Sequence, residues 1–209
     1  NFILKTAGDY LEKAPSRKDV LCIFAGLRPL AADPDNTGAT REVSRRHKIS
    51  LSPSGLLSIV GGKWTTYRRM AEETLDKAIT SGFLEKHKCI TKELKLDDQQ
   101  NGDAGRLRIY GKGSGEIRQM TESDPALGRP MHAALPYTKA EIVWICRNEM
   151  VCNIEDVLAR RTRSLFLNAA ASLEMAPEVA DIMASEHGYD QKWKNEQVNS
   201  YKALAGKYM

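Results

Sequence analysis

A polar stretch near the middle of the chain limits what this sequence can fold into. Residues 85–106 are poor in apolar side chains, and the run Asp97-Asp98-Gln99-Gln100-Asn101-Gly102-Asp103 contains none that could pack in a core. Segments of this composition typically connect folded parts. We therefore expect two parts, residues 1–82 and residues 107–209, joined by a polar linker over residues 83–106.

The composition is that of an ordinary globular protein. The chain has 209 residues, of which 42% are hydrophobic, enough for a core. No run approaches eighteen apolar residues and the start lacks a secretory signal, so we expect a cytoplasmic chain. It starts on Asn1 within an apolar helical pattern, as a piece of a longer protein would. The 31 basic and 27 acidic residues are well mixed, which argues against nucleic acid as a partner.

The cysteines predict neither a metal site nor a disulfide framework. Cys22, Cys89, Cys146 and Cys152 are scattered, with no Cys-x-x-Cys pair and no histidine at ligand spacing. We expect free thiols and no metal. A disulfide between two of them stays open as the alternative.

The first part reads as strands followed by a helix. The apolar run at residues 20–25 predicts a buried strand, and residues 47–51 and 56–60 predict a hairpin. Apolar residues then recur at helical spacing from Trp64 to Ile79, and Gly82 predicts the end of that helix. The order is strand, two glycines, helix.

The second part carries helix signals and no strand signal. Thr138 and Glu141 form a predicted capping box, followed by a buried side. That side comprises Ile142, Val143, Ile145 and Met150. Further caps are expected at Asn153 and Asp190, a first-turn proline at Pro177 and a helix end at Gly188. We therefore predict an α+β, mainly α fold whose C-terminal domain is all helix.

The glycine pair Gly61-Gly62 suits a ligand that carries negative charge. A strand that ends in glycines and opens a helix brings bare backbone amides and the positive helix end to one place. Lys63 adds a full positive charge, and Thr65 and Thr66 offer amides and hydroxyls. A flavin ring that accepts hydride needs such an environment. From these residues alone, a tight turn into a helix remains the alternative.

Two further residues are candidates for a site. Arg28 follows the first predicted strand, and Pro29 holds its backbone extended, so its planar fork could grip an anion. A surface or interdomain salt bridge is the other interpretation. His47 is either a structural imidazole or a base near substrate.

These motifs together resemble one family. The segments Ala25-Gly26-Leu27-Arg28-Pro29-Leu30, Ser44-Arg45-Arg46-His47 and Gly61-Gly62-Lys63-Trp64-Thr65-Thr66-Tyr67-Arg68 look like the last third of FAD-dependent, respiratory glycerol-3-phosphate dehydrogenase. Leu135-Pro136-Tyr137, the run from Glu155 to Arg163, and Ala176-Pro177-Glu178-Val179-Ala180 are similar to its helical C-terminal domain. The resemblance covers nearly the whole chain.

The resemblance implies a reaction and roles. The parent enzyme would oxidise sn-glycerol 3-phosphate to dihydroxyacetone phosphate, passing hydride to FAD and electrons to a membrane quinone. Arg28 would hold the substrate through its phosphate, and Lys63 would sit near the flavin's N1 edge and the substrate. Gly62, Lys63, Trp64 and Thr65 would contact the flavin. Residues 1–82 would be the C-terminal part of the FAD and substrate domain.

One departure from the family pattern matters. No Gly-x-Gly-x-x-Gly follows an opening strand, so the ADP half of FAD has no cradle here. The loop Gly111-Lys112-Gly113-Ser114-Gly115 follows no strand and is expected to connect helices. We expect this chain alone to bind no FAD and to be inactive.

Alternatives of other classes stay open. The parent could be an amine or 2-hydroxy-acid flavin oxidase. The helical half could instead serve as an interaction or membrane-attachment module, with Arg160-Arg161-Thr162-Arg163 on anionic lipid at the inner face of the cell membrane. Intramolecular salt bridges are the other interpretation of that run, and Trp144 and Trp193 are expected in the core. A homo-oligomer is compatible with the sequence.

Overall fold

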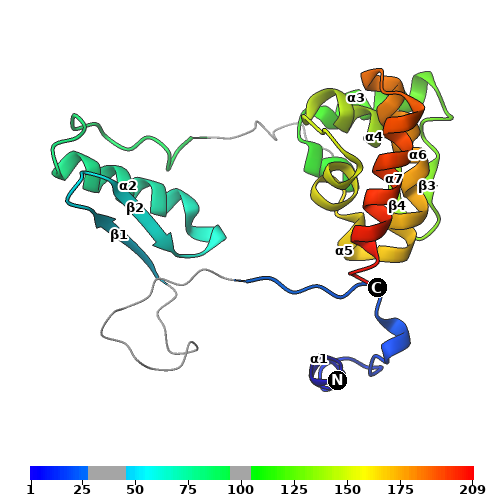
Figure 1. Cartoon of the computed structure of the whole chain (residues 1–209), viewed down its shortest axis with the longest axis horizontal. Coiled ribbons are helices and arrows are strands. Elements are labelled where there is room, and N and C mark those ends of the chain that lie inside the picture. The colour runs from blue at the N-terminus through cyan, green and yellow to red at the C-terminus, as the bar shows by residue number, and fades with distance from the viewer. Residues whose placement is uncertain (28–45, 95–104) are drawn as a thin grey trace. The chain divides into compact units, whose positions relative to one another are not determined.

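The computed structural model describes residues 1–27, 46–94 and 105–209 (Figure 1). Contacts divide the chain into two compact units. One, the helical unit, comprises Asn1–Ala25 and Asp97–Met209, and the other, the hairpin unit, comprises Gly26–Leu96. The contacts thus group residues 1–25 with the helical unit. The domain boundaries expected from the sequence refer to the parent protein and stay a prediction.

The hairpin unit is built as the sequence predicts. Strands β1 (His47–Leu51) and β2 (Leu57–Gly61) pair antiparallel, with Ile49 opposite Ile59. A short 3-10 turn, η3 (Trp64–Thr66), leads into helix α2 (Tyr67–Thr80), which lies along the hairpin in Figure 1. Gly82, just beyond the helix, has φ 78°, the left-handed conformation typical of a glycine after a helix end. The hairpin and the helix are confirmed.

The helical unit surrounds one apolar core. Its main elements are η5 (Arg106–Tyr110), α3 (Gly113–Ser123), α4 (Lys139–Asn148), the π-helix η6 (Asp156–Arg161), α5 (Ser164–Leu167), α6 (Ala169–His187) and α7 (Gln191–Ala205). Near the N-terminus lie α1 (Phe2–Gly8) and the short η1 (Arg17–Asp19). Ile142, Ile145, Leu158, Met175 and Met183 are fully buried. The fold is mainly α, as predicted.

Several predicted caps are confirmed. Thr138 accepts a hydrogen bond from the Glu141 amide, and Glu141 accepts one in return from the Thr138 amide. Asp190 accepts from the Trp193 amide at 2.7 Å, and Gly188 ends α6 with φ 73°. Asn153 accepts from the Asp156 amide at 2.9 Å. Local hydrogen-bonding chemistry in the sequence therefore predicts where these helices begin and end.

The capping carboxylate Glu141 is also the centre of a buried polar cluster. Its side chain is 0% exposed and accepts a bidentate pair of bonds from Arg106. The Tyr110 hydroxyl donates to it at 2.8 Å. Burial, reinforced by the Glu141 charge, raises the pKa of Tyr110, so its proton stays available for that bond. The cluster ties the segment after the polar linker to α4.

The predicted strand at residues 20–25 is wrong. These residues form no regular element, and their backbone bonds go to helix ends: the Ile23 amide donates to the Tyr208 carbonyl, and the Leu21 carbonyl accepts from the Ala169 amide. The Phe24 ring packs edge-on against Phe166 at 5.1 Å. Apolar continuity suits a strand, but no other described strand pairs with this run.

The expectation of a strand-free second part is wrong at one place. Strands β3 (Pro130–His132) and β4 (Leu135–Thr138) form a short hairpin with an irregular register. Each strand has four residues or fewer, too short for the sequence pattern to predict a strand. The hairpin runs directly into the cap at Thr138 and so belongs to the entry of α4.

Three single positions also differ from expectation. Pro177 lies in the interior of α6, because that helix starts earlier, at a cap formed by Asn168 on the Ala171 amide. Met150 is 88% exposed, since α4 ends at Asn148. Gly113 begins α3 and is buried against Trp144, so the segment Gly111–Gly115, expected to be a loop, is partly helix.

Gly113 and Gly115 offer a matched test of this packing. A Cβ on Gly113 would overlap the Trp144 ring, whereas a Cβ on Gly115 would meet nothing within 4 Å. Gly113→Ala is expected to lower the free energy of unfolding of the helical unit by about 1–3 kcal/mol through overpacking. Gly115→Ala should instead raise it by up to about 1 kcal/mol. Urea denaturation measures both, and equal effects would contradict the packing.

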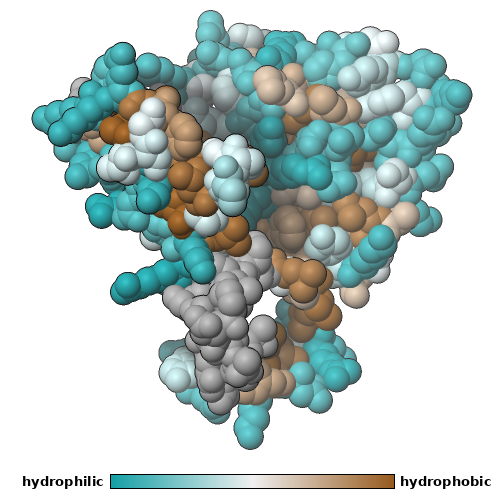
Figure 2. Space-filling model, turned by 60° about the vertical axis from the view of Figure 1, so that its left-hand side comes forward, coloured by the Kyte–Doolittle hydropathy of each residue, from teal (hydrophilic) through white to brown (hydrophobic). Residues whose placement is uncertain are grey.

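Apolar side chains also reach the surface. Brown areas interrupt the hydrophilic surface in Figure 2, and exposed apolar residues of the hairpin unit include Leu56, Trp64, Leu75, Phe83 and Ile90. A two-stranded sheet with one helix has little apolar area to bury, so this unit has only a small core of its own.

Candidate functional site

The glycine pair makes a sharp turn between β2 and the helix. Gly61 and Gly62 both have φ 81°, a region that residues with a Cβ rarely adopt. A Cβ on Gly62 would also lie 2.5 Å from the Met70 sulfur and 3.3 Å from the His47 Cβ. The turn therefore needs glycine at Gly62 for conformation and for space. This accounts for the glycines structurally and also leaves their backbone bare.

The residues that follow present side chains to solvent. Lys63 is extended and caps η3, whose Thr66 hydroxyl donates back to the Lys63 carbonyl at 2.9 Å. Lys63, Trp64 and Thr65 are exposed, Trp64 to 87%. Within the described residues none of these three side chains forms a hydrogen bond or ion pair; the Trp64 ring meets only Tyr67, at 5.8 Å. We call residues 61–66 the glycine loop.

The glycine loop carries hydrogen-bond donors and positive charge, which suit a planar ring that gains negative charge. The first amides of a helix have no acceptor within the helix and point toward its N-terminal end. An ammonium group and an indole stand beside them, both open to solvent. Such a loop can offer donors and positive charge to a ring edge on which negative charge develops. Gly62, Lys63, Trp64 and Thr65 are consecutive in the sequence, and their role as flavin contacts stays a prediction.

The other two candidate residues, Arg28 and His47, are not part of the glycine loop. Arg28 lies outside the described residues, and its role stays a prediction. The His47 ring bonds to Glu73 at 2.7 Å and its side chain is only 18% exposed. Hydrogen bonds from Arg69 and then from His47 lower the pKa of Glu73. These contacts favour the structural interpretation of His47, as a tie between β1 and α2.

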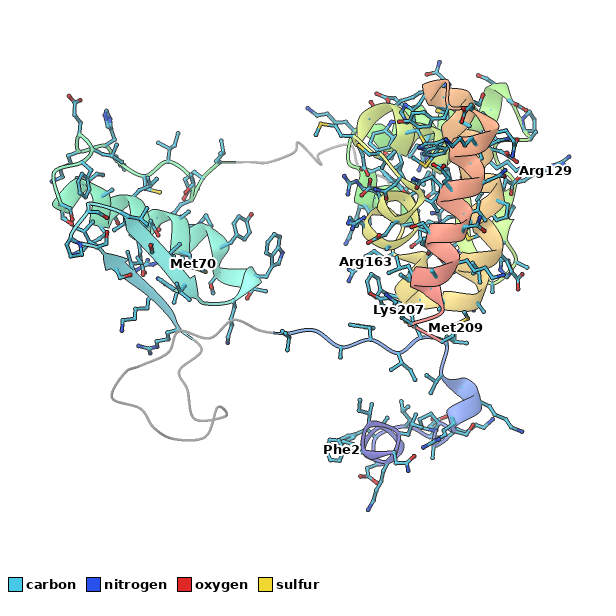
Figure 3. The ribbon with its side chains drawn as sticks, viewed as in Figure 1. Phe2, Met70, Arg129, Arg163, Lys207 and Met209 are labelled. Atoms are coloured by element: carbon cyan, nitrogen blue, oxygen red, sulfur yellow. The ribbon has the colours of Figure 1, made fainter. Side chains whose placement is uncertain are left out.

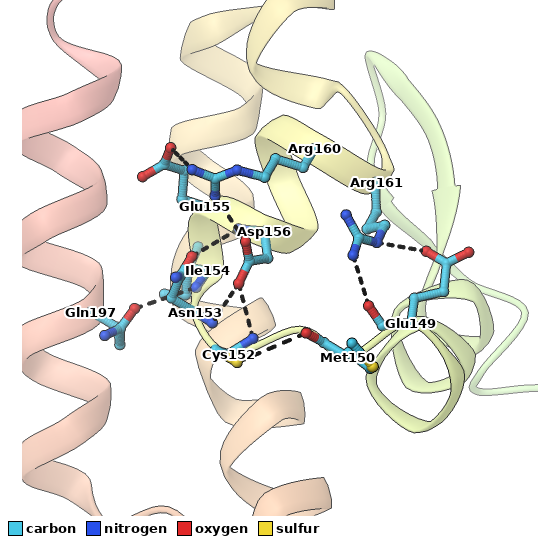
Figure 4. A network of polar contacts seen from close by, with 10 residues as sticks. All are labelled: Glu149, Met150, Cys152, Asn153, Ile154, Glu155, Asp156, Arg160, Arg161 and Gln197. Carbon is cyan, nitrogen blue, oxygen red and sulfur yellow. Dashed lines mark hydrogen bonds and ion pairs between the residues drawn. The ribbon is translucent and has the colours of Figure 1, made fainter. Parts of the chain in front are cut away.

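The basic run in the helical unit is largely neutralised from within. Arg160 pairs with Glu155 at 2.6 Å and with Asp156 at 2.8 Å (Figure 4). Arg161 reaches the Glu149 carboxylate at 3.1 Å and the Glu149 carbonyl at 2.8 Å. The salt-bridge interpretation therefore applies to these two arginines. It weakens the case for a lipid surface at this run.

The tryptophans of the helical unit make structural contacts. The Trp144 indole donates to Glu116 at 2.7 Å and its ring meets Tyr110. Trp193 stacks on Tyr189 with ring centres 4.2 Å apart. Both are partly buried against the core.

The turn at Arg163, which has φ 59°, cannot be predicted from the sequence, because arginine carries no signal for that conformation.

The fold and the loop define a mainly α protein in which a glycine loop opens a helix ahead of a separate helical unit. Residues 56–194, well over half of the chain, match the family model described as the C-terminal domain of alpha-glycerophosphate oxidase. The chain belongs to this family, and it is similar to part of several proteins named as glycerol-3-phosphate dehydrogenases. The resemblance noted in the sequence is confirmed.

Named relatives agree with the family. The chain is 34% identical over 222 residues to the probable mitochondrial glycerol-3-phosphate dehydrogenase of Caenorhabditis elegans, a match covering 94% of this chain and 30% of the relative. It is 33% identical to the mitochondrial glycerol-3-phosphate dehydrogenases of Macaca fascicularis and Homo sapiens, covering 97% and 96% of this chain and 31% and 30% of those proteins. The chain thus spans under a third of their length.

Across the described ranges, each helix is too short or too polar to pass through a lipid bilayer.

Proposed function

We propose that the complete protein containing this chain oxidises sn-glycerol 3-phosphate to dihydroxyacetone phosphate, with FAD as hydride acceptor and a quinone as final acceptor. The observation that carries this proposal is the match along 94% of the chain to a relative named as a glycerol-3-phosphate dehydrogenase. The family-model match, over residues 56–194, includes the glycine loop.

The glycine loop fits the reactive half of the cofactor. FAD, when bound, supplies the hydride-accepting ring. The bare backbone of Gly62 permits close approach, and the exposed Lys63 would hold positive charge at the ring's N1 edge and near the substrate. Trp64 and Thr65 would contact the ring edge. Arg28 would hold the substrate phosphate through its planar fork.

The same proposal assigns the rest of the cofactor to another part of the complete protein. No Gly-x-Gly-x-x-Gly is present in this sequence to hold the ADP half. We expect the isolated chain to be colourless after purification and to show no dehydrogenase activity. Stoichiometric FAD on the isolated chain, with activity, would contradict this assignment.

A substrate comparison tests the reaction. The complete protein is assayed with a soluble quinone analogue and, in turn, sn-glycerol 3-phosphate, a 2-hydroxy acid and a primary amine. Quinone reduction is expected with glycerol 3-phosphate alone. Reduction driven by the amine or the 2-hydroxy acid, and none by glycerol 3-phosphate, would replace this proposal with another flavin oxidase.

Location and assembly remain parts of the proposal. A quinone acceptor requires contact with a membrane surface, for which peripheral attachment suffices. The cytoplasmic location and a homo-oligomeric state stay predictions. The helical-module alternative has less support, because Arg160 and Arg161 are paired within the unit.

A further inference from the structure

One arginine of the helical unit is held in a backbone conformation that disfavours it. Arg163 has φ 59° and ψ 19°, in the left-handed region that residues with a Cβ rarely adopt. It lies in the turn between the π-helix η6 and α5, and its side chain is exposed (Figure 3). Unfavourable backbone conformations persist where the surrounding structure enforces them, and they concentrate at functional positions.

Two buried hydroxyls enforce this turn. Thr162 and Ser164 flank Arg163 and are 1% and 0% exposed. The Thr162 hydroxyl donates to the Val157 carbonyl at 2.9 Å, so the Ser164 hydroxyl, 2.8 Å away, donates to Thr162. Both neighbours therefore point inward, and Arg163 between them is directed outward.

Arg163 differs from Arg160 and Arg161 of the same run in its ion pairing. Arg160 and Arg161 are each paired with carboxylates. Arg163 forms no ion pair or side-chain hydrogen bond with any residue of the ranges 1–27, 46–94 and 105–209. Its backbone is held in one conformation and its side chain is exposed, with a planar fork that matches one carboxylate.

We infer that Arg163 anchors the helical unit to a carboxylate on the portion of the complete protein that lies outside this chain. The named relatives extend far beyond the matched part, since the chain covers about 30% of their length. Arginine is enriched at protein interfaces. Lipid headgroups are bound by clusters of about 4–8 basic residues, whereas Arg163 is the one arginine of residues 160–163 without an ion pair among the described residues. The inference rests on family membership and not on the proposed reaction.

Limited proteolysis of the complete protein tests the anchor. Arg163→Gln should speed cleavage within the polar linker about tenfold, the effect of losing one charge-assisted contact. Arg163→Asn should speed it as much, although asparagine tolerates the left-handed turn, which separates lost charge from backbone strain. Arg163→Lys should give an intermediate rate, because it keeps the charge without the fork. Raising the salt concentration should speed cleavage of the wild type more than of Arg163→Gln.

The control is Arg129→Gln. Arg129 is another exposed arginine with no side-chain partner among the described residues, has no positive φ, and lies on the opposite side of the helical unit in Figure 3. Its replacement should leave cleavage unchanged. The isolated chain should be cleaved at the same rate with and without Arg163→Gln.

Other outcomes would overturn the inference. Unchanged linker cleavage in Arg163→Gln does so directly, and so does a tenfold increase in the isolated chain, which would show an effect on internal folding. Unchanged cleavage with a smaller oligomer would identify a second copy as the partner. Unchanged cleavage with lost binding to anionic vesicles would identify lipid. Proteolysis needs no turnover, so failure of glycerol 3-phosphate oxidation would leave this test intact.

Discussion

Glu141→Ala is expected to lower the free energy of unfolding of the helical unit by about 3–5 kcal/mol. The substitution leaves the Arg106 guanidinium without the buried carboxylate that it grips bidentately. It also removes the acceptor for the Tyr110 hydroxyl and half of the capping box at Thr138. Chemical denaturation followed by tryptophan fluorescence measures the loss, with Trp64 of the hairpin unit replaced by phenylalanine in all samples.

Glu196→Ala is the matched control for Glu141. Glu196 is a 64% exposed glutamate on α7 whose amine partner, on Lys192, is 4.0 Å away. Its removal should change the free energy of unfolding by less than about 0.5 kcal/mol. If Glu141→Ala lowered the free energy of unfolding no more than this control, the buried cluster would not stabilise the helical unit.

Lys63→Met in the complete flavoprotein is expected to lower turnover with saturating glycerol 3-phosphate by about 10²–10³-fold. Its ammonium group is exposed and unpaired among the described residues, and it follows the bare glycine backbone. Under the proposed function its charge acts on the ring edge during hydride transfer. FAD content should stay at one per chain, because the ADP half is held elsewhere. Steady-state kinetics and flavin absorbance report the two effects separately.

Lys48→Met provides the comparison for Lys63. Lys48 is an exposed lysine on β1 of the same hairpin and has no ion pair with a described residue. Turnover should be unchanged. Equal losses in the two variants, or release of FAD by Lys63→Met, would remove the assigned role of Lys63.

Features set by a few neighbouring residues could be predicted from the sequence. The cap at Thr138 with Glu141 and the helix end at Gly188 depend on side-chain and glycine chemistry within one turn. The hairpin at 47–61 follows from alternation around a turn. For the same reason the sequence predicts the order of strand, glycines and helix at the glycine loop.

Features that depend on distant partners could not be predicted in this way. The run at residues 20–25 is apolar enough for a strand, but its conformation is decided by Tyr208 and Ala169, far along the chain. The bond from Arg106 to Glu141 joins two residues that are 35 positions apart, and no local sequence pattern predicts it. The left-handed turn at Arg163 is imposed by buried hydroxyls rather than by the arginine itself.

We propose that this chain supplies the ring-contacting loop of a flavin site that serves glycerol 3-phosphate. The most direct measurement is anaerobic mixing of the complete protein with sn-glycerol 3-phosphate while the visible absorbance of its flavin is followed. One equivalent of substrate is expected to bleach the bound FAD. A complete protein without flavin, or a bound flavin that stays oxidised with this substrate, would contradict it.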